Sequence, residues 1–170
     1  MLAPGPVKLI IGFIFKNEDT FYRAERILEK KYGKIDFISE ILEFNHTDYY
    51  EKEFGQGLKR RFISFRRLIP AEDLSKIKNF TNKVEKKLSG KGLRRINIDP
   101  GYLNLAKLVL ASTKDFTHRV YLGKGIFAEI TLFYQDKAFR PREWTYPDYR
   151  TAEYGVIFNQ IREIYAKQKS

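Results

Sequence analysis

The sequence contains an almost continuous apolar run at residues 7–15, VKLIIGFIF, in which Lys8 is the one charged residue. A strand with one buried face alternates apolar and polar residues, whereas a strand covered on both faces reads as an unbroken apolar run. We therefore predict a central strand with structure on both sides. The run is far shorter than the roughly 20 residues that span a bilayer, and no basic stretch precedes it, so we do not interpret it as a signal or membrane segment.

Two amphipathic helices and three more strands are predicted after this run. Asn17, followed by two acidic residues, is typical of a helix N-terminus, and Gly33 of its end. A second helix is expected to begin at Pro70 and to end at Gly90, because its apolar residues recur at three-four spacing. The further strands are predicted at residues 35–44, 58–69 and 93–99.

The order strand, helix, strand, strand, helix, strand is typical of a ferredoxin-like βαββαβ core. We place this core at residues 7–99 of an α+β protein. If the first strand is apolar on both sides, residues 101–170 must cover or extend the sheet. In that extension we predict a hairpin, 118–122 with 126–134, and a last helix. A length of 170 residues fits a single domain, 1–170.

The net charge of +11 is concentrated in one segment. Residues 58–95 hold 13 basic and 3 acidic side chains and so carry +10 of the total. This predicts a positive surface around the third strand and the second helix, suited to RNA or another phosphate-bearing ligand. The residues expected to bind phosphate or to stack on bases are Lys59, Arg61, Arg67, Tyr49 and Tyr50. The alternative is a solvated, lysine-rich surface of the kind found in thermophiles.

The chain has no cysteine. This excludes disulfides, a disulfide-linked partner, thiolate nucleophiles and cysteine-ligated metal centres. The composition fits a reducing cytoplasm. A divalent metal, if one is used, would need histidine and carboxylate ligands.

Five titratable residues are candidates for acid–base catalysis or for holding a divalent metal: His46, Asp48, Asp99, His118 and Glu129. Asp99 precedes a Pro-Gly pair, which predicts a β-turn, with a catalytic carboxylate at a strand end as the alternative. The hairpin register decides what faces Glu129. A two-residue turn at residues 123–124 places His118 opposite Glu129, and a three-residue turn places Arg119 there.

The segment EWTYPDYR, residues 143–150, is dense in aromatic and charged side chains just before the last helix. Trp144, Tyr146 and Asp148 are therefore candidates for a ligand pocket or a lid. The alternative is that the aromatic residues fix the helix to the sheet. Neither glycine-rich phosphate motif, G-x-x-x-x-G-K-[ST] or G-x-G-x-x-G, is present. Residues 82–85, NKVE, are similar to the guanine-reading N-K-x-D but fall within a predicted helix.

Several segments in combination resemble one protein family: NHTDYYEKEFG at 45–55, KRRFISF at 59–65, NIDPGYL at 97–103, THRVYLGKGIFAEITL at 117–132 and EWTYPDYR at 143–150. The family is an uncharacterised prokaryotic one, catalogued as a domain of unknown function (DUF4416-like). The resemblance covers nearly the whole chain. Some similar proteins carry a GTP-binding label, but the resemblance implies no catalytic residue.

Three functions follow as hypotheses. The first is binding of RNA or another phosphate-bearing ligand at the basic surface. The second is an enzyme that acts on a phosphorylated small molecule or nucleotide, with Lys59 and Arg61 on the phosphate and the five titratable residues in acid–base or metal roles. The third is an interaction protein without a small ligand, which predicts an exposed apolar patch. No membrane partner is expected.

Overall fold

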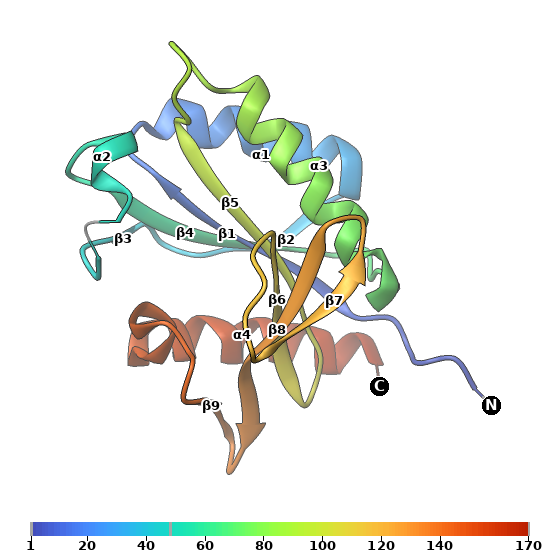
Figure 1. Ribbon diagram of the computed structural model, residues 1–170. Helices are drawn as coiled ribbons and strands as arrows, with labels where there is room; N and C mark the ends of the chain where they lie inside the picture. Colours follow the sequence, from blue (N-terminus) through green and yellow to red (C-terminus); the bar gives the residue numbers. More distant parts are fainter. Residues whose placement is uncertain (1, 48, 170) are drawn as a thin grey trace.

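The strand predicted at residues 7–15 is β1 (Lys8–Phe15), and all eight of its residues are buried. The computed structural model describes residues 2–47 and 49–169, and Figure 1 shows how the elements are layered. β1 pairs with β4 (Lys59–Phe65) on one side and with β5 (Ile96–Leu103) on the other. The continuous apolar run thus corresponds to an interior strand with two covered faces.

Within the described residues, nine strands form one antiparallel sheet with four α-helices, which confirms the predicted α+β class. The pairing order is β2-β4-β1-β5-β6-β8-β7, with β3 on β4 and β9 on β8. The remaining strands are β2 (Ile35–Ile38), β3 (Leu42–Glu43), β6 (Lys107–Ser112), β7 (Arg119–Gly123), β8 (Ile126–Gln135) and β9 (Ala138–Pro141). The helices are α1 (Glu18–Tyr32), α2 (Glu51–Phe54), α3 (Leu74–Lys87) and α4 (Ala152–Lys169), with short 3₁₀ turns η1 (Ala71–Asp73) and η2 (Pro147–Arg150).

Helices cover both faces of the sheet. α1 and α3 lie on one face, and α4 lies on the other (Figure 1). The odd-numbered residues of β1 share a core with Phe21 of α1 and Val84 of α3, whereas Ile10 shares a core with Phe158 and Ile161 of α4. None of the helices in the described part of the chain is both long and apolar enough to cross a membrane.

Lys8, the charged residue of the apolar run, is fully buried at the start of β1. Its ammonium group forms an ion pair with Asp36 of β2 and donates a 2.7 Å hydrogen bond to Oε1 of Gln168 in α4. Burial lowers the pKa of Lys8, and the bond to Asp36 opposes that shift. A buried charge requires such partners, so Lys8 ties β2 and the end of α4 to the sheet.

The C-terminal strands extend the sheet through a short joint between β5 and β6. Three residue pairs form this joint: Gly101 with Leu110, Tyr102 with Val109 and Leu103 with Leu108. β6, β8, β7 and β9 continue the sheet beyond it. The residues after 103 therefore both extend the sheet, through four strands, and cover one face of it, through α4.

Three predicted strands have wrong boundaries, and one of them, expected at residues 93–99, is β5 at Ile96–Leu103. The strand expected at residues 35–44 is interrupted at residues 39–41 and forms β2 and β3. Ser39 lies at the break, and its Oγ accepts a 2.9 Å hydrogen bond from the backbone N–H of Phe62, so a side chain replaces a ladder bond there. The third strand ends at Phe65, four residues earlier than expected.

The β-turn predicted at Asp99 is also wrong, because Asp99, Pro100 and Gly101 lie inside β5. Pro100 pairs with Ile11 of β1, whereas pairing with β6 begins only at Gly101. β5 therefore has no neighbouring strand on its other side at Pro100. A proline is tolerated in a strand where its missing N–H is not needed for a ladder.

Candidate functional site

Arg60 of β4 carries a guanidinium group that is buried between the sheet and the start of α4. Its Nε donates a 3.0 Å hydrogen bond to Oη of Tyr154, and its Nη2 donates a 2.8 Å bond to Oδ2 of Asp148. Four rings surround Cζ at centroid distances of 5.2 to 5.8 Å: Phe44, Phe62, Tyr149 and Tyr154. Burial raises the pKa of Tyr154 to about 12, so its hydroxyl stays protonated. The cation is stabilised by one carboxylate and by the ring faces.

Gly12 of β1 leaves room for this guanidinium. A Cβ atom at Gly12 would lie 2.8 Å from Cε1 of Phe62 and 3.1 Å from Nη1 of Arg60. Gly12 pairs with Phe62 on one side and with Asp99 on the other. Directly paired residues point to the same face, so Asp99 faces the side of the sheet on which Arg60 lies.

The carboxylate of Asp99 lies between two cations. Its Oδ2 accepts a 2.7 Å hydrogen bond from Nδ2 of Asn97. Nη1 of Arg60 lies 3.7 Å from Oδ2, and Nζ of Lys78 lies 3.8 Å from Oδ1. Both N–O distances are too long for hydrogen bonds. Burial, followed by the charge of Asp99, raises the pKa of Tyr50, so this phenol remains a neutral neighbour of the carboxylate.

Glu85 of α3 links the helix to the beginning of β5. Its Oε2 accepts a 2.6 Å hydrogen bond from the backbone N–H of Ile98, and its Oε1 lies 3.5 Å from Nη1 of Arg94. Arg94 also donates hydrogen bonds to both carboxylate oxygens of Glu53 in α2. Burial raises the pKa of Glu85 even though cations on Lys78 and Arg94 oppose the shift.

Substituting Glu85→Gln is expected to change the pH dependence of stability. Because its pKa is raised in the folded protein, the wild type binds more protons folded than unfolded just above pH 4.5, the ordinary glutamate value. Its free energy of unfolding should therefore fall, relative to the variant, as pH rises through this window. Urea unfolding of both proteins between about pH 4 and 8 measures the difference. If the difference in unfolding free energy between the two proteins does not vary with pH, the pKa of Glu85 is not raised in the folded protein.

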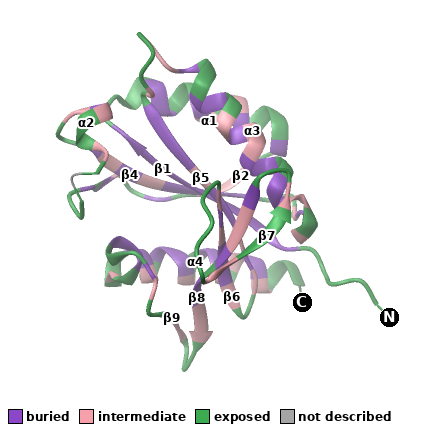
Figure 2. Cartoon of the chain, viewed as in Figure 1, coloured by how far each residue is buried: buried purple, intermediate pink, exposed green. Residues whose placement is uncertain are grey.

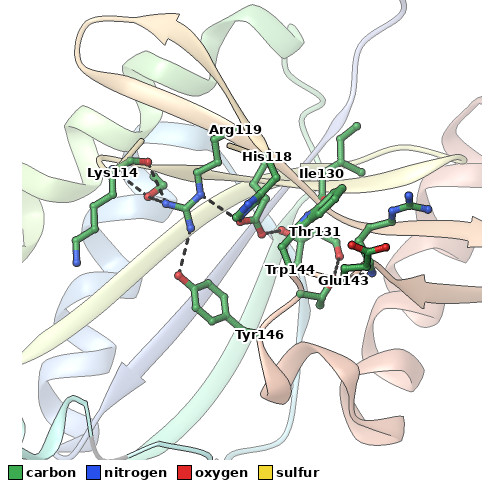
Figure 3. Close-up of polar contacts among 12 residues, drawn as sticks. Lys114, His118, Arg119, Ile130, Thr131, Glu143, Trp144 and Tyr146 are labelled. Atoms are coloured by element: carbon green, nitrogen blue, oxygen red, sulfur yellow. Dashed lines mark hydrogen bonds and ion pairs between the residues drawn. The ribbon is translucent and has the colours of Figure 1, made fainter. Parts of the chain in front are cut away.

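Glu129 of β8 is a buried carboxylate with three side-chain partners, and these partners, His118, Arg119 and Thr131, are labelled in Figure 3. Its Oε1 lies 2.9 Å from Nε2 of His118 and accepts a 3.1 Å hydrogen bond from Nε of Arg119. Its Oε2 accepts a 2.9 Å bond from Oγ1 of Thr131. The register pairs Arg119 with Glu129, which is the pairing expected for a three-residue turn. The turn is nevertheless a two-residue one, between the paired Gly123 and Ile126, and a bulge at Leu122 produces this register. His118, the residue just before β7, nevertheless contacts the same oxygen of Glu129.

The ring of His118 is stacked between two aromatic rings. Its centroid lies 5.7 Å from that of Phe116 and 5.1 Å from that of Trp144, with interplanar angles of 17° and 12°. Nε1 of Trp144 donates a 2.9 Å hydrogen bond to the carbonyl oxygen of Ile130 (Figure 3). Nη2 of Arg119 donates a 3.2 Å bond to Oη of Tyr146. These contacts fix the segment 143–150 to the β7–β8 hairpin.

A groove of about 640 Å³ lies where the end of α1, the β4–α3 loop and α3 meet. We call it the basic groove, because its lining contains five cations and one carboxylate: Lys31, Arg67, Lys76, Lys83 and Lys124 with Asp73. Lys124 belongs to the β7–β8 turn, and its carbonyl oxygen accepts a 3.2 Å hydrogen bond from Nδ2 of Asn79 in α3. The basic groove is therefore built by segments far apart in the sequence.

The three cations predicted to bind phosphate do not converge. Lys59 forms an ion pair with Glu18 at 3.3 Å, and Arg61 donates a 2.7 Å hydrogen bond to the carbonyl oxygen of Ser39. Arg67 alone of the three lines the basic groove. A strand rises about 3.3 Å per residue, so the two ends of β4 are about 20 Å apart.

The predicted stacking residues lie around α2 and not in the basic groove. Tyr50 stacks on Phe54 with centroids 5.8 Å apart. Tyr49 is exposed, and its Oη accepts a 3.2 Å hydrogen bond from Nζ of Lys114.

The residues predicted as catalytic are distributed over separate surroundings. Among the described residues, no group of three or more histidine and acidic side chains has a geometry that could hold a metal ion. Asp99 contacts Arg60 and Lys78, whereas Glu129 contacts His118. His46 lines a different cavity of about 340 Å³, together with the carboxylates Glu40, Glu43 and Glu153. Asp48 lies outside the described residues.

Sequence reasoning did not single out Arg60, Tyr149 and Tyr154 as one unit, although it named Asp148. A signal for Arg60 was present, since it alternates in phase with Phe62 on the face of β4 that points towards α4. It also missed Lys83 and Lys124 as neighbours, because only the tertiary structure brings the β7–β8 turn to α3.

The chain was compared with known families, curated proteins and solved structures. Residues 5–165 match a family described as a domain of unknown function (DUF4416). No curated protein and no solved structure matches the chain.

Proposed function

Since the chain belongs to the DUF4416 family, which has no known function, we propose from its own geometry that it binds a phosphate-bearing polyanion, single-stranded RNA, in the basic groove. The observation that carries this proposal is the excess of cations in one concave surface. Five cationic side chains and one carboxylate line a volume of about 640 Å³. Cations that follow a phosphate backbone are the main source of affinity for nucleic acids.

Most of these cations are not neutralised within the protein. Lys76 forms an ion pair with Asp73 at 3.7 Å. Within the part of the chain that the structure describes, the other four groove cations form no ion pair with a carboxylate. Nη2 of Arg67 donates a 3.0 Å hydrogen bond to the carbonyl oxygen of Lys31, which leaves its charge uncompensated. The groove therefore retains a strongly positive potential.

The size and the apolar part of the lining also support this ligand class. Ligand pockets in proteins commonly measure about 300–1,000 Å³, and the basic groove lies within that range. Phe80 and Tyr32 line it, with ring centroids 5.7 Å apart, and Nζ of Lys31 lies over the Phe80 ring, 5.1 Å from its centroid. Aromatic side chains beside cations are the combination with which proteins bind single-stranded nucleic acids.

We further infer that β2, β4, β1 and β5, with α1 and α3, form a ferredoxin-like core. This rests on their pairing order and on the two helices that share one face. RNA-binding sheets of this kind use the face without helices. Here α4 covers that face, which is the reason to place the ligand on the helical side.

The test is binding of a fluorescently labelled single-stranded RNA across a salt series. Arg67→Gln combined with Lys83→Gln should weaken binding and reduce the slope of log K against log salt by about 1.4, since each phosphate contact contributes about 0.7 on single strands. Lys86→Gln is the matched control, because Lys86 is an exposed cation of the same helix that does not line the groove.

Three results would decide against the proposal. These are absence of RNA binding at low salt, an unchanged salt slope in the double variant, and an equal loss in the Lys86→Gln control. Excess GTP and ATP serve as competitors. Displacement of the RNA by either nucleotide would assign the groove to a single nucleotide in place of a polyanion.

A further inference from the structure

β7 is an edge strand that leaves one side of its backbone unpaired. It is the last strand in the pairing order, and among the described strands it pairs with β8 alone. Figure 2 shows most of this strand in the colour of exposed residues. An exposed edge presents N–H and C=O groups to which another extended chain can pair.

The side chains of β7 make this edge unusually apolar. Val120, Tyr121 and Leu122 are consecutive, and they are 69, 59 and 42% exposed. Natural edge strands are commonly protected by lysine, proline or a bulge. β7 has neither lysine nor proline, and its one bulge, at Leu122, leaves residues 119–121 in regular pairing with β8. Arg119, its one charged residue, directs its guanidinium to Glu129 and Tyr146 and so does not protect the edge.

We propose that β7 is a self-association surface, where two copies of this chain pair antiparallel through their β7 strands. The flanking charges favour a second copy. Asp115 lies in the loop before β7 and Lys124 in the turn after it, and both are exposed. Neither forms an ion pair with another described residue. Antiparallel self-pairing centred on Val120 brings the start of one strand next to the end of the other, so each Asp115 lies near the Lys124 of the second copy.

The charge of the protein gives this dimer a distinctive salt dependence. Each copy carries +11, so two copies repel one another at long range. Added salt screens this repulsion and also weakens the exposed Asp115–Lys124 pairs, which contribute little. Strand pairing and apolar contact remain in place. The dimer should therefore become stronger with salt, whereas RNA binding in the basic groove should become weaker, so the two proposals can fail independently.

Analytical ultracentrifugation of the whole chain tests the proposal. The wild type is expected to change from monomer to dimer with a dissociation constant of about 10 to 100 µM, in keeping with a small interface. Val120→Lys should weaken the dimer at least about tenfold, because it places a charge at the centre of the edge. Val156→Lys is the matched control, since Val156 is 57% exposed on α4, and it should dimerise as the wild type does.

Hydrogen exchange of the wild type gives a second measurement that needs no variant. Amides of residues 119–123 should exchange more slowly at high than at low protein concentration, while other exposed edges remain unchanged. A wild type that is monomeric up to about 1 mM, a Val120→Lys variant that dimerises normally, or exchange in β7 that does not depend on concentration would each overturn the proposal.

Discussion

Asp148→Ala is expected to lower the free energy of unfolding by about 3 to 5 kcal/mol, the typical cost of removing one partner of a buried ion pair. Among the described residues, Asp148 is the one carboxylate that makes a hydrogen bond with Arg60, at 2.8 Å. Asp99 lies 3.7 Å from the guanidinium and already interacts with Lys78, so it compensates only partly. The variant leaves a cation that is 2% exposed without a close anion.

Chemical denaturation at neutral pH measures this loss. Glu163→Ala, which removes an exposed carboxylate of α4, should change stability by less than about 0.5 kcal/mol. Arg60→Met combined with Asp148→Ala should recover most of the loss, because replacing a whole buried pair by apolar groups is often neutral. A loss below about 1 kcal/mol in Asp148→Ala would mean that the guanidinium reaches water or another acceptor.

Gly101→Ala is expected to cost about 3 kcal/mol by opening the joint between β5 and β6. A Cβ atom at this position would lie 2.3 Å from the carbonyl oxygen of Val109 and 2.7 Å from Cδ2 of Leu110. The first contact is with backbone, which a rotamer change cannot relieve. Since the joint has only three residue pairs, a shift here separates β6 from the N-terminal strands.

Gly155→Ala is the matched control for this substitution. Apart from the backbone of its own helix and its chain neighbours, no described atom lies within 4 Å of a Cβ at Gly155, in α4, so alanine should stabilise the helix by about 0.5 to 1 kcal/mol. Hydrogen exchange should locate the effect of Gly101→Ala, with faster exchange in β6 than in β1. Equal stability of Gly101→Ala and the wild type would show that the two strands separate at little cost.

Local patterns in the sequence predict the first half of the fold well. The apolar run of β1, the Asn17 cap and Gly33 stop of α1, and the three-four spacing of α3 are short-range signals. They fail at two residues. Ser39 interrupts a predicted strand because its side chain accepts a backbone hydrogen bond, and Pro100 is tolerated inside β5 because no strand pairs there on the side away from β1. The tolerance of Pro100 depends on where β6 begins to pair with β5, which is a property of the tertiary structure and not of the local sequence.

The site residues were harder to predict, because charge counts along the chain do not reveal which charges share a surface. The segment 58–95 is strongly basic, yet Lys59 and Arg61 are engaged with Glu18 and Ser39 at one end of β4. Lys31 and Lys124, which lie outside that segment, complete the basic groove. Sequence composition predicted a positive surface, but the fold decides which cations remain unpaired.

The position of α4 has a consequence for synthesis on the ribosome. β1 emerges before the other strands of this sheet, and one of its faces is covered by α4, which includes Gln168 bonded to Lys8. At about 5 to 20 residues per second, that face stays uncovered for about 10 to 30 s. The most apolar strand of the chain must therefore be kept from other nascent chains until the last helix arrives.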